Sequence, residues 1–126
     1  MTLEQRAQQF WPVLVFAASH QKVISASMLS QITGYLEAPG PVLYYIHCYC
    51  RLNDLPPLDA IVIDPVTGRP GHECLRDYRD WSTLQTCVFL YDWINYFAPT
   101  EEMLAEAVAK QDEIDMANAG YIALPC

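Results

Sequence analysis

Apolar residues recur at helical spacing through the first part of the chain. Between residues 3 and 18 they return every three or four positions, the period of a helix with one buried face. Thr2 and Gln5 are spaced as a capping box that begins this helix. Pro12 removes a backbone donor, so it should kink the helix or start a second one. The predicted inward residues are Leu3, Ala7, Phe10, Trp11, Leu14, Val15 and Ala18.

Two further helices are predicted before residue 53. Ser25 or Ser27 can cap the first of them, and Gly34 is a natural end because glycine tolerates the left-handed conformation. Pro41 suits the first turn of the next helix, which should run to about Leu52. The residues of that helix expected to face inward are Val42, Leu43, Ile46, Tyr49 and Cys50.

Four segments favour strands. Residues 22–24 indicate a short extended piece, and residues 60–63, after two prolines, are apolar and mostly β-branched, as in a buried strand. Residues 65–68 predict a tight turn, followed by a short or irregular strand. Residues 86–91 fit either a strand or a helix, and we favour a strand.

The last helix is acidic. Thr100 can cap it, and Glu101 and Glu102 lie in the first turn, where the helix dipole favours acids. Gly120 should end it, before a tail at 121–126. Its predicted inner face consists of Leu104, Ala107, Val108 and Gln111, with Ile114 at the margin.

Composition and charge narrow the classes of function. The chain has 126 residues, 52% hydrophobic and 17% charged, which excludes disorder and favours one domain. Its net charge of −8 lies mostly after residue 91 and repels nucleic-acid phosphates and anionic membranes. The longest apolar run, 13–18, is too short to cross a bilayer, and no secretory signal pattern is present. The chain has five cysteines, an odd number. Together with the missing secretory signal, this number favours free thiols and a cytoplasmic location.

The predicted element order is helix, short strand, two helices, strand, turn and strand. Residues 11–71 resemble the small winged-helix half of alkyltransferase-like DNA-repair proteins and similar uncharacterised bacterial and phage proteins. The matching pieces are Val23-Ile24-Ser25 before a helix, Gly34 at its end, Asn53 to Pro57, and the strand with Gly68. The resemblance implies an α+β domain over 1–126, with a winged-helix-like core at 1–97 ending in a β-hairpin. The acidic helix and tail at 98–126 are an addition to that core.

The active site of that family does not carry over. Its Pro-Cys-His-Arg motif would fall near residues 57–62, where this chain reads Pro-Leu-Asp-Ala-Ile-Val. The nucleophilic cysteine is missing, and so is the arginine that the family places in its recognition helix. We therefore expect neither alkyl transfer nor base flipping.

Candidate chemistry is sparse. The only plausible metal set is His47, Cys48, Cys50, His72 and Cys74. The first three point in different directions around one helix, so they cannot share an ion. No nucleotide-binding or metalloprotease motif occurs, and we predict no metal, no cofactor and no catalytic residue. A nucleophilic pair, Cys74 with His72 or Cys48 with His47, stays open as an alternative.

These observations favour a non-enzymatic binding protein, such as a small bacterial or phage regulator or inhibitor that contacts another protein. A DNA-binding winged-helix regulator and a small thiol- or metal-dependent enzyme are the alternatives, and homodimerisation stays open. Tyrosines are typical of interfaces, and acidic helix faces suit basic partners. The predicted partner-binding residues are Tyr44, Tyr45, His47, Tyr49, Glu101, Glu102, Glu106, Asp112 and Glu113.

Overall fold

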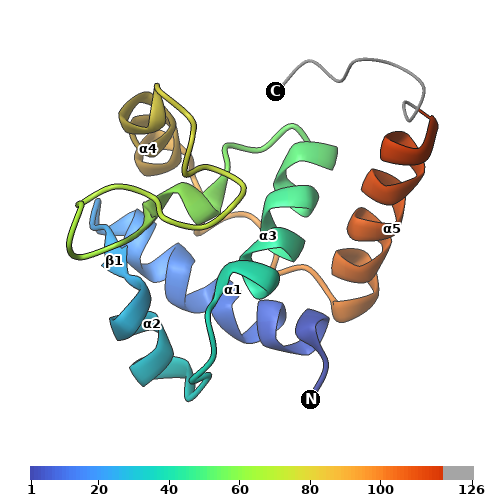
Figure 1. The fold of residues 1–126 in the computed structure, drawn as a ribbon, viewed down its shortest axis with the longest axis horizontal. Coiled ribbons are helices and arrows are strands. Elements are labelled where there is room, and N and C mark those ends of the chain that lie inside the picture. The colour runs from blue at the N-terminus through green and yellow to red at the C-terminus, as the bar shows by residue number, and fades with distance from the viewer. Residues whose placement is uncertain (118–126) are drawn as a thin grey trace.

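The computed structural model describes residues 1–117 and is a mostly helical α+β structure (Figure 1). The predicted α+β class is confirmed, since helices pack around a very small parallel sheet. The elements are α1 (Leu3–Ser19), β1 (Ile24–Ser25), α2 (Ala26–Thr33), α3 (Gly40–Leu52), the 3-10 helix η1 (Leu58–Ile61), β2 (Val62–Ile63), α4 (Trp81–Leu90) and α5 (Glu101–Ala117).

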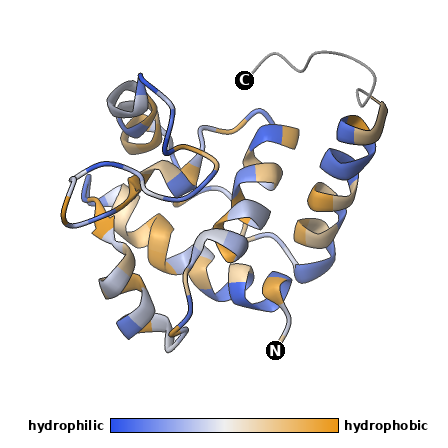
Figure 2. Cartoon of the chain, in the orientation of Figure 1, coloured by the Kyte–Doolittle hydropathy of each residue, from blue (hydrophilic) through white to orange (hydrophobic). Residues whose placement is uncertain are grey.

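Helix α1 lies at the centre and contacts α2, α3, α5, α4 and η1. The capping box is formed, because the Gln5 amide donates to Thr2 Oγ1 at 3.2 Å and the Thr2 amide donates to Gln5 Oε1 at 2.8 Å. Pro12 lies inside a single continuous helix on its exposed side, so no second helix begins there. Figure 2 shows orange, apolar turns through the middle of α1. The buried residues of α1 are Ala7, Phe10, Trp11, Leu14, Ala17 and Ala18.

Helices α2 and α3 begin and end largely as predicted. Ser25 Oγ accepts the amide of Met28 at 3.1 Å at the start of α2, and Gly34 ends it in the left-handed conformation with φ of 75°. Helix α3 carries a proline in its first turn and ends at Leu52. All five residues predicted to face inward from α3 are buried.

The sheet consists of two short parallel strands, with Ile24 opposite Val62 and Ser25 opposite Ile63. The strand predicted at 60–63 is therefore only partly formed. Its first half belongs to η1, because the Ala60 amide donates to the carbonyl of Pro57 and closes a tight turn. All four residues of η1 are buried.

The hairpin predicted after residue 63 does not form in the part of the chain that the structure describes. The turn is present, with the amide of Gly68 donating to the Asp64 carbonyl and the amide of Asp64 donating to the Arg69 carbonyl. No strand follows it among the described residues. Pro70 has no amide hydrogen to continue a ladder, and a Cβ atom added at Gly71 would lie only 3.3 Å from Asp64 Cβ.

The strand favoured at 86–91 is wrong, since this segment lies in α4 and the residue after it. The inner side of α4 is narrow and consists mainly of Gln85 and Val88, which are spaced as neighbours on a helix. Gln85 Nε2 donates to the carbonyl of Ala60 in η1 at 2.9 Å. The buried Trp93 indole donates to the Val88 carbonyl at 2.8 Å and so satisfies an acceptor at the end of α4.

Helix α5 packs against α3 and α1 and adds Leu104 and Ala107 to the buried core. Thr100 Oγ1 accepts the Met103 amide at 3.2 Å, which confirms the predicted cap. Ile114 is 50% exposed, so the inner face ends before it. The predicted helix end at Gly120, the tail and Cys126 lie outside the described residues. Within 1–117, every helix is too short or too polar to cross a bilayer.

Candidate functional site

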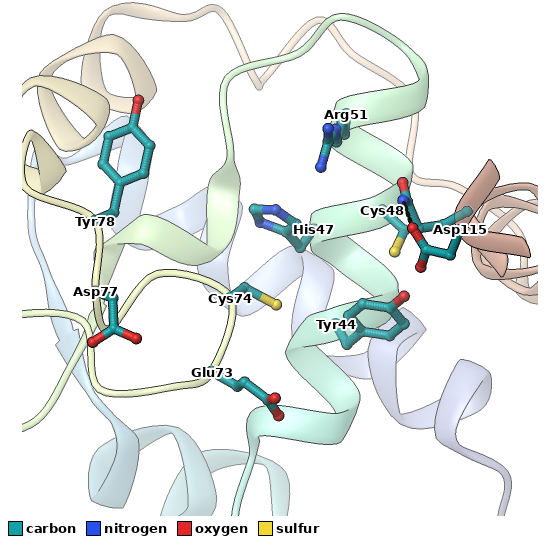
Figure 3. Close-up of a pocket in the computed structure, with 10 residues that line it drawn as sticks. Tyr44, His47, Cys48, Arg51, Glu73, Cys74, Asp77, Tyr78 and Asp115 are labelled. Atoms are coloured by element: carbon teal, nitrogen blue, oxygen red, sulfur yellow. Dashed lines mark hydrogen bonds between the residues drawn. The ribbon is translucent and has the colours of Figure 1, made fainter. Parts of the chain in front are cut away.

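A cluster of polar side chains lies between α3, η1 and the loop that follows β2. Its centre is Asp59, a carboxylate with no exposed surface. His47 comes from α3, and His72 and Cys74 come from the loop. Figure 3 shows His47 projecting from α3, with Cys74 of the loop next to it at one wall of a pocket. The fold therefore brings together groups from three separate segments.

Two histidines bind the Asp59 carboxylate. His47 Nδ1 lies 3.0 Å from Oδ2 and 3.3 Å from Oδ1, and His72 Nε2 lies 2.8 Å from Oδ2. An ionised carboxylate can only accept hydrogen bonds, so both ring nitrogens must carry the hydrogen and donate it. The side chain of His72 is 4% exposed and that of His47 is 20% exposed. This buried acid is therefore satisfied by two donors, as buried charges require.

The electrostatics of the cluster favour an ionised Asp59. Burial disfavours the charged carboxylate, but His47 and His72 outweigh burial and hold the pKa of Asp59 well below its ordinary value. Burial also disfavours a charged His47, but the Asp59 carboxylate raises the pKa of His47 above its ordinary value. Asp59 and His47 thus stabilise each other's charged forms.

Cys74 completes the cluster, because one ligand atom each of His47, Asp59 and Cys74 lies within 4.8 Å of the other two. Burial raises the pKa of the Cys74 thiol to about 12, and it raises the pKa of the Cys48 thiol to about 11. Nucleophilic cysteines need a lowered thiol pKa. Neither pair left open from the sequence, Cys74 with His72 or Cys48 with His47, has this property.

A pocket of about 350 Å³ opens beside the cluster (Figure 3). One side belongs to α3, another to the loop, and Asp115 reaches it from α5. Among the described residues, three carboxylates line the pocket together with one guanidinium, that of Arg51. The lining residues are Tyr44, His47, Cys48, Arg51, Glu73, Cys74, Asp77, Tyr78, Gln111 and Asp115.

The tyrosines predicted to bind a partner differ in exposure. Tyr44 and Tyr45 are partly buried and pack against the core. Burial raises the pKa of both, and Asp112 on α5 adds to the shift. Tyr49 is 2% exposed and its hydroxyl lies 2.9 Å from that of Tyr96, so its ring belongs to the core.

The acids predicted to bind a partner lie along α5. Glu102, Glu106, Asp112 and Glu113 are exposed, whereas Glu101 is partly buried. They do not line the pocket, but Asp115 on the same helix does.

Sequence reasoning missed Asp59, Glu73, Asp77 and Asp115 as site residues. A signal for Asp59 was present, because it is the only charged residue in the apolar run between Pro57 and Ile63. A charge inside a buried run requires partners, and the nearby histidines were the available donors. The three pocket acids carry no such signal, since exposed acids are common on surfaces.

Comparison of the chain with protein-family models, with curated proteins and with solved structures gave no significant match in any of the three.

Proposed function

We propose that the protein is a non-enzymatic binding protein that docks on a partner protein presenting a lysine or arginine side chain. The site is the pocket between α3, α5 and the loop after β2. We further propose that this site is built on a winged-helix-like core, in which α3 takes the position of the recognition helix. The order of α1, β1, α2, α3 and β2 supports this view of the core.

The pocket lining is the observation that carries the proposal. Glu73 and Asp77 line the pocket from the loop and Asp115 lines it from α5, and Tyr44 on α3 lies between Glu73 and Asp115 (Figure 3). Carboxylates bind a cationic head through charge-assisted hydrogen bonds, and an aromatic ring can add a cation–π contact. These groups suit a long basic side chain better than an anionic or a purely apolar one.

The acidic surface of α5 supports a basic partner. Its exposed acids include Glu102, Glu106, Asp112 and Glu113, against one base, Lys110. A field of one sign beside a pocket speeds the encounter with an oppositely charged partner and disfavours wrong ones. The partner would then be guided by α5 and anchored in the pocket.

The alternative of DNA binding has less support. DNA readers use basic and amide side chains at base edges and several phosphate contacts. Helix α3 offers Arg51 near its end, and α5 packs along α3 with its acids beside Tyr44. We expect no shift of duplex DNA in a gel at low salt. A shift that weakens as salt is raised would favour the DNA-binding alternative instead.

The test compares two triple variants in affinity capture from the native cell, read by quantitative mass spectrometry. The pocket variant carries Glu73→Gln, Asp77→Asn and Asp115→Asn. The control carries Glu4→Gln, Asp54→Asn and Asp80→Asn, which changes the net charge equally but away from the pocket. We expect a partner of the wild-type chain to be lost by the pocket variant and kept by the control.

The two variants distinguish binding through the pocket from binding through the net charge of the protein. Equal loss in both variants would assign the capture to net charge alone and contradict the pocket. Retention in both would also contradict it. Overlapping peptides of the captured partner are then tested for binding to the wild-type chain. We expect only peptides that contain lysine or arginine to bind. Loss of binding when those residues are replaced by alanine would confirm that the pocket recognises a basic side chain.

A further inference from the structure

The cluster of His47, Asp59 and Cys74 has the donors of a transition-metal site. We propose that these three side chains bind a divalent transition-metal cation such as Zn²⁺, with the fourth coordination position open to the pocket. Imidazole, carboxylate and thiolate are the three ligand types that Zn²⁺ uses in proteins. This inference does not depend on the proposed function, because metal binding is measured without a partner.

The distances are close to those of a tetrahedral site. Zinc bonds of about 2.0–2.3 Å place neighbouring ligand atoms about 3.3–3.6 Å apart. His47 Nδ1 already lies 3.0 and 3.3 Å from the two Asp59 oxygens. The Cys74 ligand atom lies within 4.8 Å of the other two, so it must move by on the order of 1 Å. Cys74 lies on a loop, where such a movement is tolerated.

His72 contacts the proposed site through its hydrogen bond to the Asp59 carboxylate. Its Nε2 donates to Asp59 Oδ2 at 2.8 Å, and the ring is almost completely buried. Groups that hydrogen-bond a metal ligand fix its orientation and affect affinity strongly. His72 therefore acts as a positioning residue that fixes the carboxylate.

The pocket gives the ion a path and an open coordination position. His47 and Cys74 both line it, and Glu73 stands at its exposed rim. Three protein ligands with one open position are typical of zinc sites that exchange a water or a ligand. In this arrangement the fourth position would hold water or a carboxylate.

Metal binding replaces protons and leaves the charges balanced. The ion displaces the Nδ1 proton of the His47 imidazolium, which keeps its Nε2 hydrogen, and the Cys74 thiol releases its proton to form a thiolate–metal bond. Both protons pass to solvent through the pocket. No oxidant or reductant takes part.

The first experiment uses the full chain after chelation and dialysis. Co²⁺ is added as a spectroscopic probe, because a thiolate–Co²⁺ bond gives an intense charge-transfer band. The background carries Cys87→Ser and Cys126→Ser, so that only buried or cluster cysteines remain. We expect a saturable band with one ion per chain, displaced by Zn²⁺. Cys74→Ser should abolish the band and weaken Zn²⁺ binding more than about 100-fold.

His20→Gln is the matched control, since it removes an exposed histidine outside the cluster. It should leave the affinity unchanged, whereas His47→Gln should weaken it. A band that persists in Cys74→Ser would overturn the proposal, and so would the absence of saturable binding in the background chain.

A second experiment needs no cluster variant and so avoids the question of folding. The wild-type chain is alkylated with iodoacetamide with and without Zn²⁺, and the modified cysteines are mapped by mass spectrometry. We expect Zn²⁺ to slow modification of Cys74 at least about tenfold but not that of Cys87, the exposed internal control. Equal modification of Cys74 in both conditions would contradict the site.

Discussion

At the scale of single residues, Asp59 is the buried charge on which the stability of the fold should depend most. It is a fully buried carboxylate held by two histidines, one of them almost as deeply buried. A buried ion pair adds little net stability over an apolar replacement of the whole set, but removing one partner leaves the others uncompensated. The unfolding free energy should therefore depend strongly on this one side chain.

Asp59→Ala should lower the free energy of unfolding by about 3–5 kcal/mol. The variant leaves the donors of His47 and His72 without an acceptor in a buried place. Urea unfolding followed by tryptophan fluorescence measures the change, because Trp11 and Trp93 are buried. Glu113→Ala, at an exposed position on α5, is the control and should change the value by at most about 0.5 kcal/mol. Similar losses in both variants would contradict this role of Asp59.

At the scale of elements, α5 has one anchored half and one exposed half. Leu104 has no exposed surface and Ala107 is 1% exposed, whereas Ile114 and Met116 are 50% and 78% exposed. The helix contacts α1 and α3, its two buried residues lie in its first two turns, and its later turns present acids. The two halves should therefore respond differently to loss of an apolar side chain.

Leu104→Ala should lower the unfolding free energy by about 2–5 kcal/mol, because it opens a cavity among α1, α3 and α5. Ile114→Ala, on the same helix, should change it by at most about 0.5 kcal/mol. Chemical denaturation of the two variants beside the wild type measures both values. A large loss for Ile114→Ala would contradict this division and mean that the later turns of α5 also pack against the core.

The elements that the sequence predicts well are those with local signals. The caps at Thr2, Ser25 and Thr100 and the stop at Gly34 depend on neighbours a few residues away, and all four are confirmed. The segment at 86–91 depends on what covers it. Its apolar run suits either a strand or a helix. The helix is favoured by its packing against η1, where Gln85 donates to the Ala60 carbonyl, and by burial of Val88 on the same side.

The site was harder to predict for the same reason. His47, Asp59 and Cys74 are far apart in the sequence, and only the packing of η1 and its following loop against α3 brings them within reach. The spacing of histidine and cysteine alone pointed to side chains that diverge around one helix. Asp59, the acid that joins them, lies directly before the apolar segment that the sequence predicts as a strand.

At the scale of the whole molecule, stability should pass through a maximum at weakly acidic pH. The lowered pKa of Asp59 contributes stability above its ordinary value of 3.8, which is lost as pH falls below it. The raised pKa of His47 contributes stability below its ordinary value of 6.5, which is lost as pH rises through the higher folded value. Both contributions are present between these limits.

Urea titrations at a series of pH values measure this profile. We expect the unfolding free energy to fall below about pH 4 and again above about pH 6.5. His47→Gln should remove the fall that begins near pH 6.5, and His20→Gln should leave it. A profile that keeps rising through neutral pH in the wild-type chain would contradict the pairing of His47 with Asp59.

The central position of α1 has a consequence for how the chain folds during synthesis. The Trp11 ring packs edge-on against Tyr49 and Trp93, with ring centroids 5.6 and 5.7 Å apart. Helix α1 also contacts α5. Domains emerge from the ribosome N-terminal part first. The apolar stripe of α1 is thus made well before the residues that cover it, and the part that packs against α5 stays uncovered until α5 has left the exit tunnel. Truncation before α5 should leave a ribosome-bound chain that associates with chaperones, rather than a smaller native fold.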